Sequence, residues 1–152
     1  MEKLKTLVGI LCLGAMIGCA THVNVSTTHR EDLSAQSKVL AIAARNLEDS
    51  VHRNRAKGSE EEAAGAVARF HKEAETFARV AGAWRDDLQV DTAFERLIDA
   101  YANMEARFDD LQPDALTREA HQRVQYEWEK LQRASGYAGK KYQKEAEKKY
   151  RD

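Results

Sequence analysis

This sequence of 152 residues contains a single proline, only two cysteines, and few aromatic residues, which make up 7% of the chain. The cysteines are Cys12 and Cys19, so residues 20–152 have no thiol with which to form a disulfide. Positive and negative charges are nearly equal in number, with 24 Lys and Arg and 25 Asp and Glu. This balance disfavours a dedicated nucleic-acid-binding protein, because such proteins carry a clear basic excess.

The sequence also lacks the usual motifs of catalysis and cofactor binding. It has no glycine-rich phosphate loop, no Gly-x-Ser-x-Gly elbow and no Cys-x-x-Cys-His haem attachment site. We therefore predict a protein that is not an enzyme and has no cofactor.

The five histidines are the remaining candidates for metal ligands: His22, His29, His52, His71 and His121. Di-iron helical bundles use Glu-x-x-His pairs on two helices, and only Asp49-x-x-His52 comes near that spacing. We interpret the histidines as solvated or bundle-edge residues. A bundle that holds a metal, haem or a small apolar molecule between its helices remains the alternative.

What the sequence does contain favours helices. Alanine, glutamate, arginine and lysine recur throughout, and these side chains lose little rotamer freedom on a helix. Hydrophobic residues make up 43% of the chain, enough for a modest core. The sequence has no Asn-Gly or Asp-Gly hairpin turn and no sustained alternation of polar and apolar residues, so it predicts no strand.

The N-terminal segment has the order of a secretory signal. Lys3 and Lys5 precede an uncharged, mostly apolar stretch over residues 6–17. As a helix this stretch spans about 18 Å, against about 30 Å of bilayer hydrocarbon, so it is short for a transmembrane anchor. An ordinary secretory signal and an uncleaved anchor are the two alternatives to the interpretation that follows.

The run Met16-Ile17-Gly18-Cys19 resembles the lipobox of bacterial lipoproteins, in which small and apolar residues precede a cysteine. The resemblance implies cleavage between Gly18 and Cys19, a diacylglycerol thioether on Cys19, and a further acyl chain such as palmitate on the new amine. The implied location is the cell envelope, with the chain anchored to a membrane by lipid. Ala20, by the same resemblance, implies the outer membrane, with the domain facing the periplasm.

We predict four segments: a signal peptide (1–18), a lipidated tether (19–27), a helical bundle (28–139) and a basic tail (140–152). Three pairs resemble capping boxes and predict helix starts: Thr28 with Glu31, Ser59 with Glu62, and Thr92 with Glu95. Asp114, after Pro113, predicts a fourth. Between them apolar residues recur at spacings of three and four, which predicts an all-α antiparallel four-helix bundle with coiled-coil-like packing. A three-helix bundle is the runner-up.

The apolar stripes assign most aromatic residues to the core: Phe70, Phe77, Trp84, Phe94, Tyr101, Phe108 and Trp128. The stripes also include Leu88 in the second helix and Leu116 in the fourth. Tyr126, Tyr137 and Tyr150 lie off them and are the better candidates for contact with a partner. We predict a non-catalytic interaction or structural module, bound to the membrane through Cys19, with an envelope protein as partner, self-association possible, and no nucleic acid.

Overall fold

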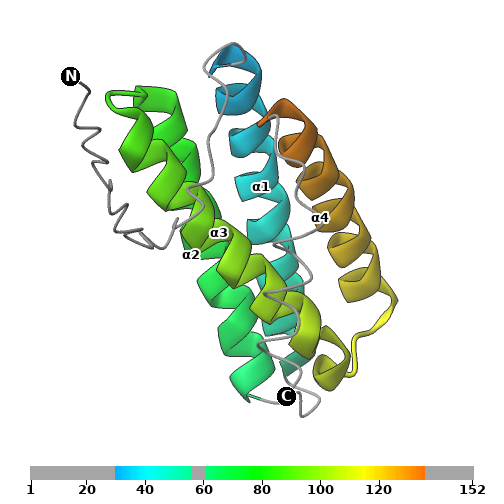
Figure 1. Cartoon of the computed structure of the whole chain (residues 1–152). Helices are drawn as coiled ribbons and strands as arrows, with labels where there is room; N and C mark the ends of the chain where they lie inside the picture. The colour runs from blue at the N-terminus through cyan, green and yellow to red at the C-terminus, as the bar shows by residue number, and fades with distance from the viewer. Residues whose placement is uncertain (1–29, 56–60, 136–152) are drawn as a thin grey trace, which may run out of the picture.

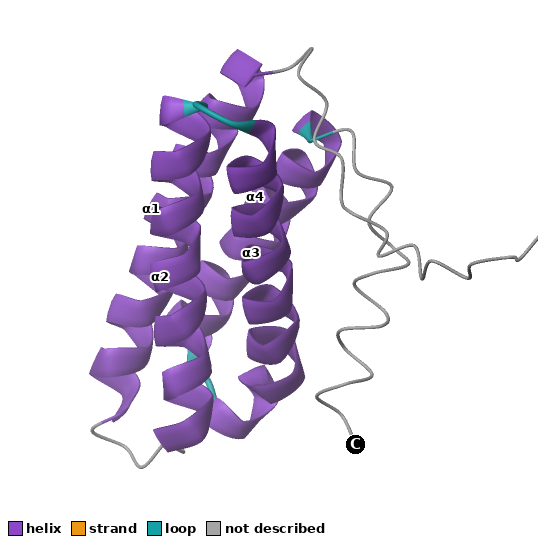
Figure 2. Cartoon of the chain, turned by 60° about the vertical axis from the view of Figure 1, so that its left-hand side comes forward, coloured by secondary structure: helices purple, strands orange, loops and turns teal. Residues whose placement is uncertain are grey.

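The computed structural model describes residues 30–55 and 61–135. In this part of the chain a short 3-10 turn, η2, follows the third of four α-helices: α1 (Arg30–Arg55), α2 (Glu61–Ala83), α3 (Asp87–Arg107), η2 (Phe108–Leu111) and α4 (Ala115–Ala134). The helices lie side by side and run alternately down and up (Figures 1 and 2). The predicted all-α four-helix bundle is therefore confirmed.

The predicted stripes form the core. Leucines dominate the inner face of α1, phenylalanines and alanines that of α2, and aromatic residues that of α3. The side chains with no exposed surface include Leu33, Leu40, Leu47, Phe70, Phe77, Phe94, Leu97 and Leu131. Burying an apolar side chain of this size contributes about 1.5–3 kcal/mol, so this set supplies most of the driving force for folding.

The helix pairs differ in how closely their backbones approach. α1 packs directly on α2 and on α4, and α2 packs directly on α3. Buried alanines on these helices leave room for a close approach: Ala43, Ala44, Ala74, Ala81 and Ala100.

The backbones of α3 and α4 approach less closely, because large aromatic rings fill the space between them. The rings of Tyr101 and Trp128 stack with centroids 4.3 Å apart, and Phe94 lies 6.2 Å from Trp128 on the same side. Such pairs add about 0.5–1.5 kcal/mol beyond the area they bury. Trp128 thus packs α4 against the aromatic side chains of α3.

The end of α2 differs from the prediction. The apolar spacing continues to Trp84 and Leu88, but the helix stops at Ala83, and Trp84 takes a left-handed conformation with φ of 28°. A new helix starts at Asp87, and Leu88 is 59% exposed there. The prediction was wrong because periodic spacing continued by chance across a turn.

The predicted capping role of Thr92 is also wrong. Asp86 is the N-cap of α3 and its side chain accepts a hydrogen bond from the Leu88 backbone N–H. Thr92 lies inside the helix, where its hydroxyl donates to the Leu88 carbonyl at 2.8 Å. The pair Asp86 and Gln89 has the same capping-box spacing as Thr92 and Glu95, so sequence alone offered two starts.

The connection from α3 to α4 follows the prediction. η2 ends at Leu111, the next residue Gln112 has a left-handed φ of 48°, and Pro113 follows. Asp114 caps α4 by accepting a hydrogen bond from the Thr117 backbone N–H at 2.9 Å. The assignment of Leu116 to the core is wrong, because Leu116 is 64% exposed on the first turn of α4.

Several sequence predictions lie outside the described residues. They are the signal peptide and Cys19, the caps at Thr28 and Ser59, the tail 140–152, and the residues His22, His29, Tyr137 and Tyr150.

Candidate functional site

The side of the bundle formed by α1 and α4 carries the candidate site. Two contacts set the antiparallel register of these helices: the Gln36 side chain donates to Glu127, and the Asn54 side chain donates to the Gln112 carbonyl. At a rise of about 1.5 Å per residue on each helix, this register puts Val39 level with Tyr126 and Ser50 level with Leu116.

An open groove of about 590 Å³ runs along this side. Small and polar residues of α1 form one wall, and α4 forms the other. The lining residues are Ala43, Asn46, Ser50 and Arg53 from α1, and Leu116, Glu119, Ala120, Gln122, Arg123 and Tyr126 from α4.

Exposed apolar side chains cluster along the groove. Leu116 and Tyr126 in its wall are 64% and 52% exposed, and Ile42 on the adjoining surface of α1 is 61% exposed. Val39, at 38%, lies one turn from Ala43. Scattered exposed apolar residues are ordinary, but two of the five large ones in the described residues line this groove, and Val39 and Ile42 lie one helical turn from its lining residues Ala43 and Asn46.

Tyr126 is held in place by two cations. The Arg123 guanidinium lies 5.5 Å from the ring centroid and the Lys130 ammonium 5.2 Å. Each cation–π contact at an exposed site contributes about 0.5–1 kcal/mol. Both cations also pair with Glu127, at 2.5 Å for Arg123 and 3.2 Å for Lys130. The ring is therefore presented to solvent in an ordered position.

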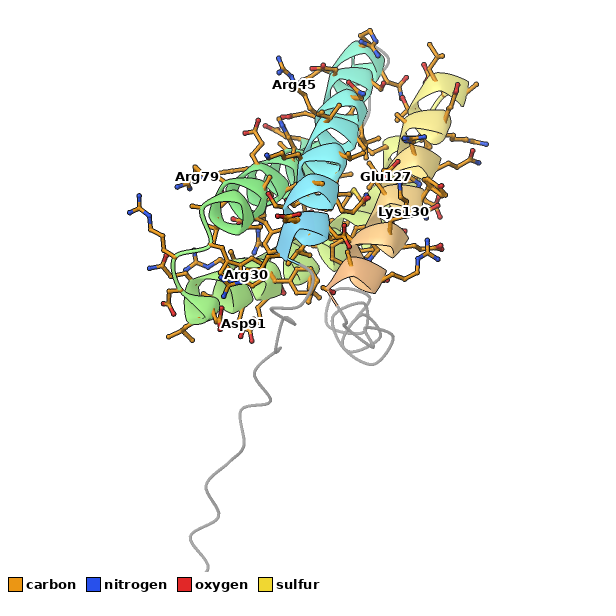
Figure 3. All side chains as sticks on the ribbon, turned by 90° about the horizontal axis from the view of Figure 1, so that it is seen from above. Arg30, Arg45, Arg79, Asp91, Glu127 and Lys130 are labelled. Atoms are coloured by element: carbon orange, nitrogen blue, oxygen red, sulfur yellow. The ribbon has the colours of Figure 1, made fainter. Side chains whose placement is uncertain are left out.

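Glu127 lies beneath this surface and has no exposed area. Figure 3 labels both Glu127 and Lys130, on the side of α4 that faces α1. Its carboxylate accepts a hydrogen bond from the Gln36 side chain at 2.7 Å. Burial by itself raises the pKa of Glu127, but the hydrogen bond from Gln36 and the charges of Lys130 and Arg123 together hold it below the ordinary value of 4.5. Glu127 is therefore a charged link between α4 and α1.

None of the three described histidines, His52, His71 and His121, lines the groove, and two of them join helices: His71 joins α2 to α1, and His121 joins α4 to α3. His71 Nδ1 on α2 lies 2.5 Å from a Glu48 oxygen on α1, and its Nε2 lies 3.2 Å from Glu75 at an angle poor for a hydrogen bond. Glu48 also lies 3.6 Å from the exposed His52. The prediction that His71 lies at the margin of the bundle agrees with its small exposed fraction.

His121 differs from the prediction of an edge or surface residue. It is only 8% exposed, its ring stacks on Phe108 at 3.6 Å, and Nε2 lies 2.6 Å from Glu105 on α3. Gln125 donates to the other oxygen of Glu105. Within residues 30–55 and 61–135, no three His, Cys, Asp or Glu side chains come together as metal ligands could.

Among the residues of the groove, sequence reasoning identified only Tyr126. Val39 and Ile42 are apolar residues outside the stripe of α1, and that mismatch was the available signal. Leu116 fits the stripe of α4 and could not have been separated from the core by spacing. Its exposure depends on how α1 packs against α4, which leaves the first turn of α4 open at the groove.

None of the helices in the described part of the chain is long and apolar enough to span a membrane. Comparisons of the chain with family models, with curated proteins and with solved structures found no match.

Proposed function

We propose that this protein is a lipid-anchored envelope lipoprotein of bacteria and that its helical bundle is a non-catalytic module for binding another protein. The observation that carries the proposal is the run Met16-Ile17-Gly18-Cys19 after a short apolar stretch. The groove between α1 and α4 supplies a surface to which a partner could bind.

The anchor follows from the chemistry implied by the lipobox. Transfer of diacylglycerol makes a thioether at the Cys19 sulfur, and cleavage after Gly18 frees an amine that takes a third acyl chain. Each buried methylene contributes about 0.8 kcal/mol, so two or more chains hold a protein on a bilayer, whereas one chain is released readily. Ala20 supports the outer membrane as the destination, with the bundle in the periplasm.

The groove suits an amphipathic helix of a partner protein. Its apolar side chains come from two antiparallel helices and are arranged along a line, which is how grooves that accept helices are built. Arg53 and Arg123 line it against one carboxylate, Glu119, and Lys130 lies next to Tyr126. A helix whose apolar stripe is flanked by acidic residues complements this surface.

The anchor is tested by replacing its nucleophile. A Cys19→Ser precursor should not incorporate a labelled fatty acid and should move from the membrane fraction to the soluble fraction of the cell. Cys12→Ser is the matched control and should behave as the unaltered chain does. Unchanged membrane association and labelling of the Cys19→Ser protein would refute the anchor.

The groove is tested with a photo-crosslinking amino acid in intact cells. Placed at Ile42 or Leu116, it should give the same heavier adduct, whereas Glu95, an exposed position on α3, should give none. Arg53→Glu should weaken the adduct and Arg53→Lys should preserve it, because the partner helix is acidic at its flanks. Equal adducts at all three positions, no adduct, or an adduct of two copies of this chain would each contradict the proposal.

A further inference from the structure

The end of the bundle at which α1 begins is also the end at which α2 turns into α3. Figure 1 shows both at the same end, and Figure 3 labels Arg30 near that end, in the view down the bundle. The Arg30 guanidinium lies 4.9 Å from the centroid of the Trp84 ring and 3.5 Å from Asp87. The start of α1 is therefore tied to the turn between α2 and α3.

This turn exposes side chains of the kind found at membrane interfaces. Leu88 is 59% exposed, Arg85 is exposed, and Trp84 is partly exposed at the edge of the core. Tryptophan and arginine are amphipathic: each buries an apolar body while its polar group stays with headgroups or water. A shallow pocket of about 330 Å³ beside the turn is lined by Arg30, Lys38 and Trp84 among others.

The acidic residues of the turn are already engaged within the protein. Asp86 accepts from the Leu88 backbone N–H as the N-cap of α3. Asp87 accepts from the Trp84 indole N–H at 2.7 Å and pairs with Arg30. These contacts offset the negative charges of Asp86 and Asp87. The two carboxylates therefore oppose contact with a zwitterionic bilayer only weakly.

The length of chain before α1 favours this end. Eleven residue steps separate Cys19 from Arg30, and fully extended they reach about 36–40 Å. α1 has 26 residues and is therefore about 39 Å long. The opposite end could reach the bilayer only with the connecting chain stretched almost fully, whereas the turn reaches it with the chain relaxed.

We infer that the α2–α3 turn is the part of the bundle that contacts the lipid surface, with Trp84, Arg85 and Leu88 placed among the headgroups of a zwitterionic bilayer. This inference rests on the proposed lipid at Cys19. It orients the bundle with its long axis away from the membrane, and it leaves the α1–α4 groove open to the periplasm.

A spin label at Leu88→Cys in the lipidated full chain, in vesicles of phosphatidylcholine and phosphatidylethanolamine, tests the inference. Collisions with a water-soluble nickel complex should be several-fold fewer at this position than at two controls. The controls carry the label at Asp110→Cys, at the opposite end of the bundle, and at Leu116→Cys, which replaces a similarly exposed leucine in the groove. Collisions with oxygen, which concentrates in lipid, should be correspondingly more frequent at position 88.

The outcomes separate this inference from the anchor. If the protein sediments with the vesicles but the label at 88 is as open to nickel as the label at 110, the turn does not contact lipid while the anchor stands. If the protein does not sediment with the vesicles, the anchor fails and the inference fails with it. A label at 88 that is shielded in cells but not in vesicles would assign the turn to a protein partner and overturn lipid contact.

Discussion

Trp128→Ala is expected to lower the free energy of unfolding by about 3–5 kcal/mol, the range for removal of a large aromatic side chain from a packed core. Trp128 is 2% exposed and stacks on both Tyr101 and Phe94. It fills the space between α3 and α4, whose backbones are farther apart than those of the directly packed helix pairs. Neither ring could move to close the cavity without leaving its other neighbours. Urea unfolding followed by circular dichroism measures the change.

Two further variants make this prediction specific. Leu116→Ala removes an apolar side chain from the same helix where it is 64% exposed, and should change stability by less than about 0.5 kcal/mol. Trp128→Phe should cost less than Trp128→Ala, because the Trp128 indole N–H has no hydrogen-bond partner among the described residues. Equal effects of Trp128→Ala and Leu116→Ala would contradict the role of Trp128 in the core.

Glu127→Gln is the second large effect. It should reduce stability at neutral pH by about 1.5–3 kcal/mol, the usual contribution of a hydrogen bond to a charged group. The amide keeps the size of the side chain but removes the charge that pairs with Arg123 and Lys130. Glu129→Gln, an exposed position on the same helix, is the matched control and should have little effect.

The effect of Glu127→Gln should depend on pH in one direction. Because the pKa of Glu127 in the folded protein lies below its ordinary value of 4.5, the unfolded chain binds the proton more tightly. The stabilisation is thus complete above pH 4.5 and is lost as the pH falls through the lower folded-state pKa. Unfolding free energies of the unaltered and variant proteins should converge in acid; a constant difference would contradict the assignment.

The parts of the fold that followed from sequence are those governed by local rules. Leu33, Leu40, Phe70 and Phe77 recur at helical spacing, and each is fully buried. Asp114 after a proline predicted a helix start, and its carboxylate caps α4. These predictions held because a period of 3.6 residues and a free backbone N–H are properties of the helix itself.

The errors share a different origin. Leu88 and Leu116 continue an apolar spacing, yet both are exposed. Leu88 follows the turn that ends α2, and Leu116 lies on the open side of α4, in the wall of the groove. His121 looked like a polar residue beside the stripe, but Phe108 and Glu105 from the preceding segments enclose it. Spacing identifies a face of a helix, and it does not say how far a neighbour covers that face.

By itself, the sequence determined that the chain forms amphipathic helices, which residues make up most of the core, and that Cys19 is the candidate for a lipid. Only the tertiary structure decided that Leu116 and Tyr126 line one open groove with residues of α1, that Glu127 is buried with its charge intact, and that Trp84 and Asp87 lie beside the start of α1. Helical periodicity acts within a few residues along the chain. The groove, the buried charge and the exposed turn depend on the register between helices that are far apart in sequence, and packing of whole helices sets that register.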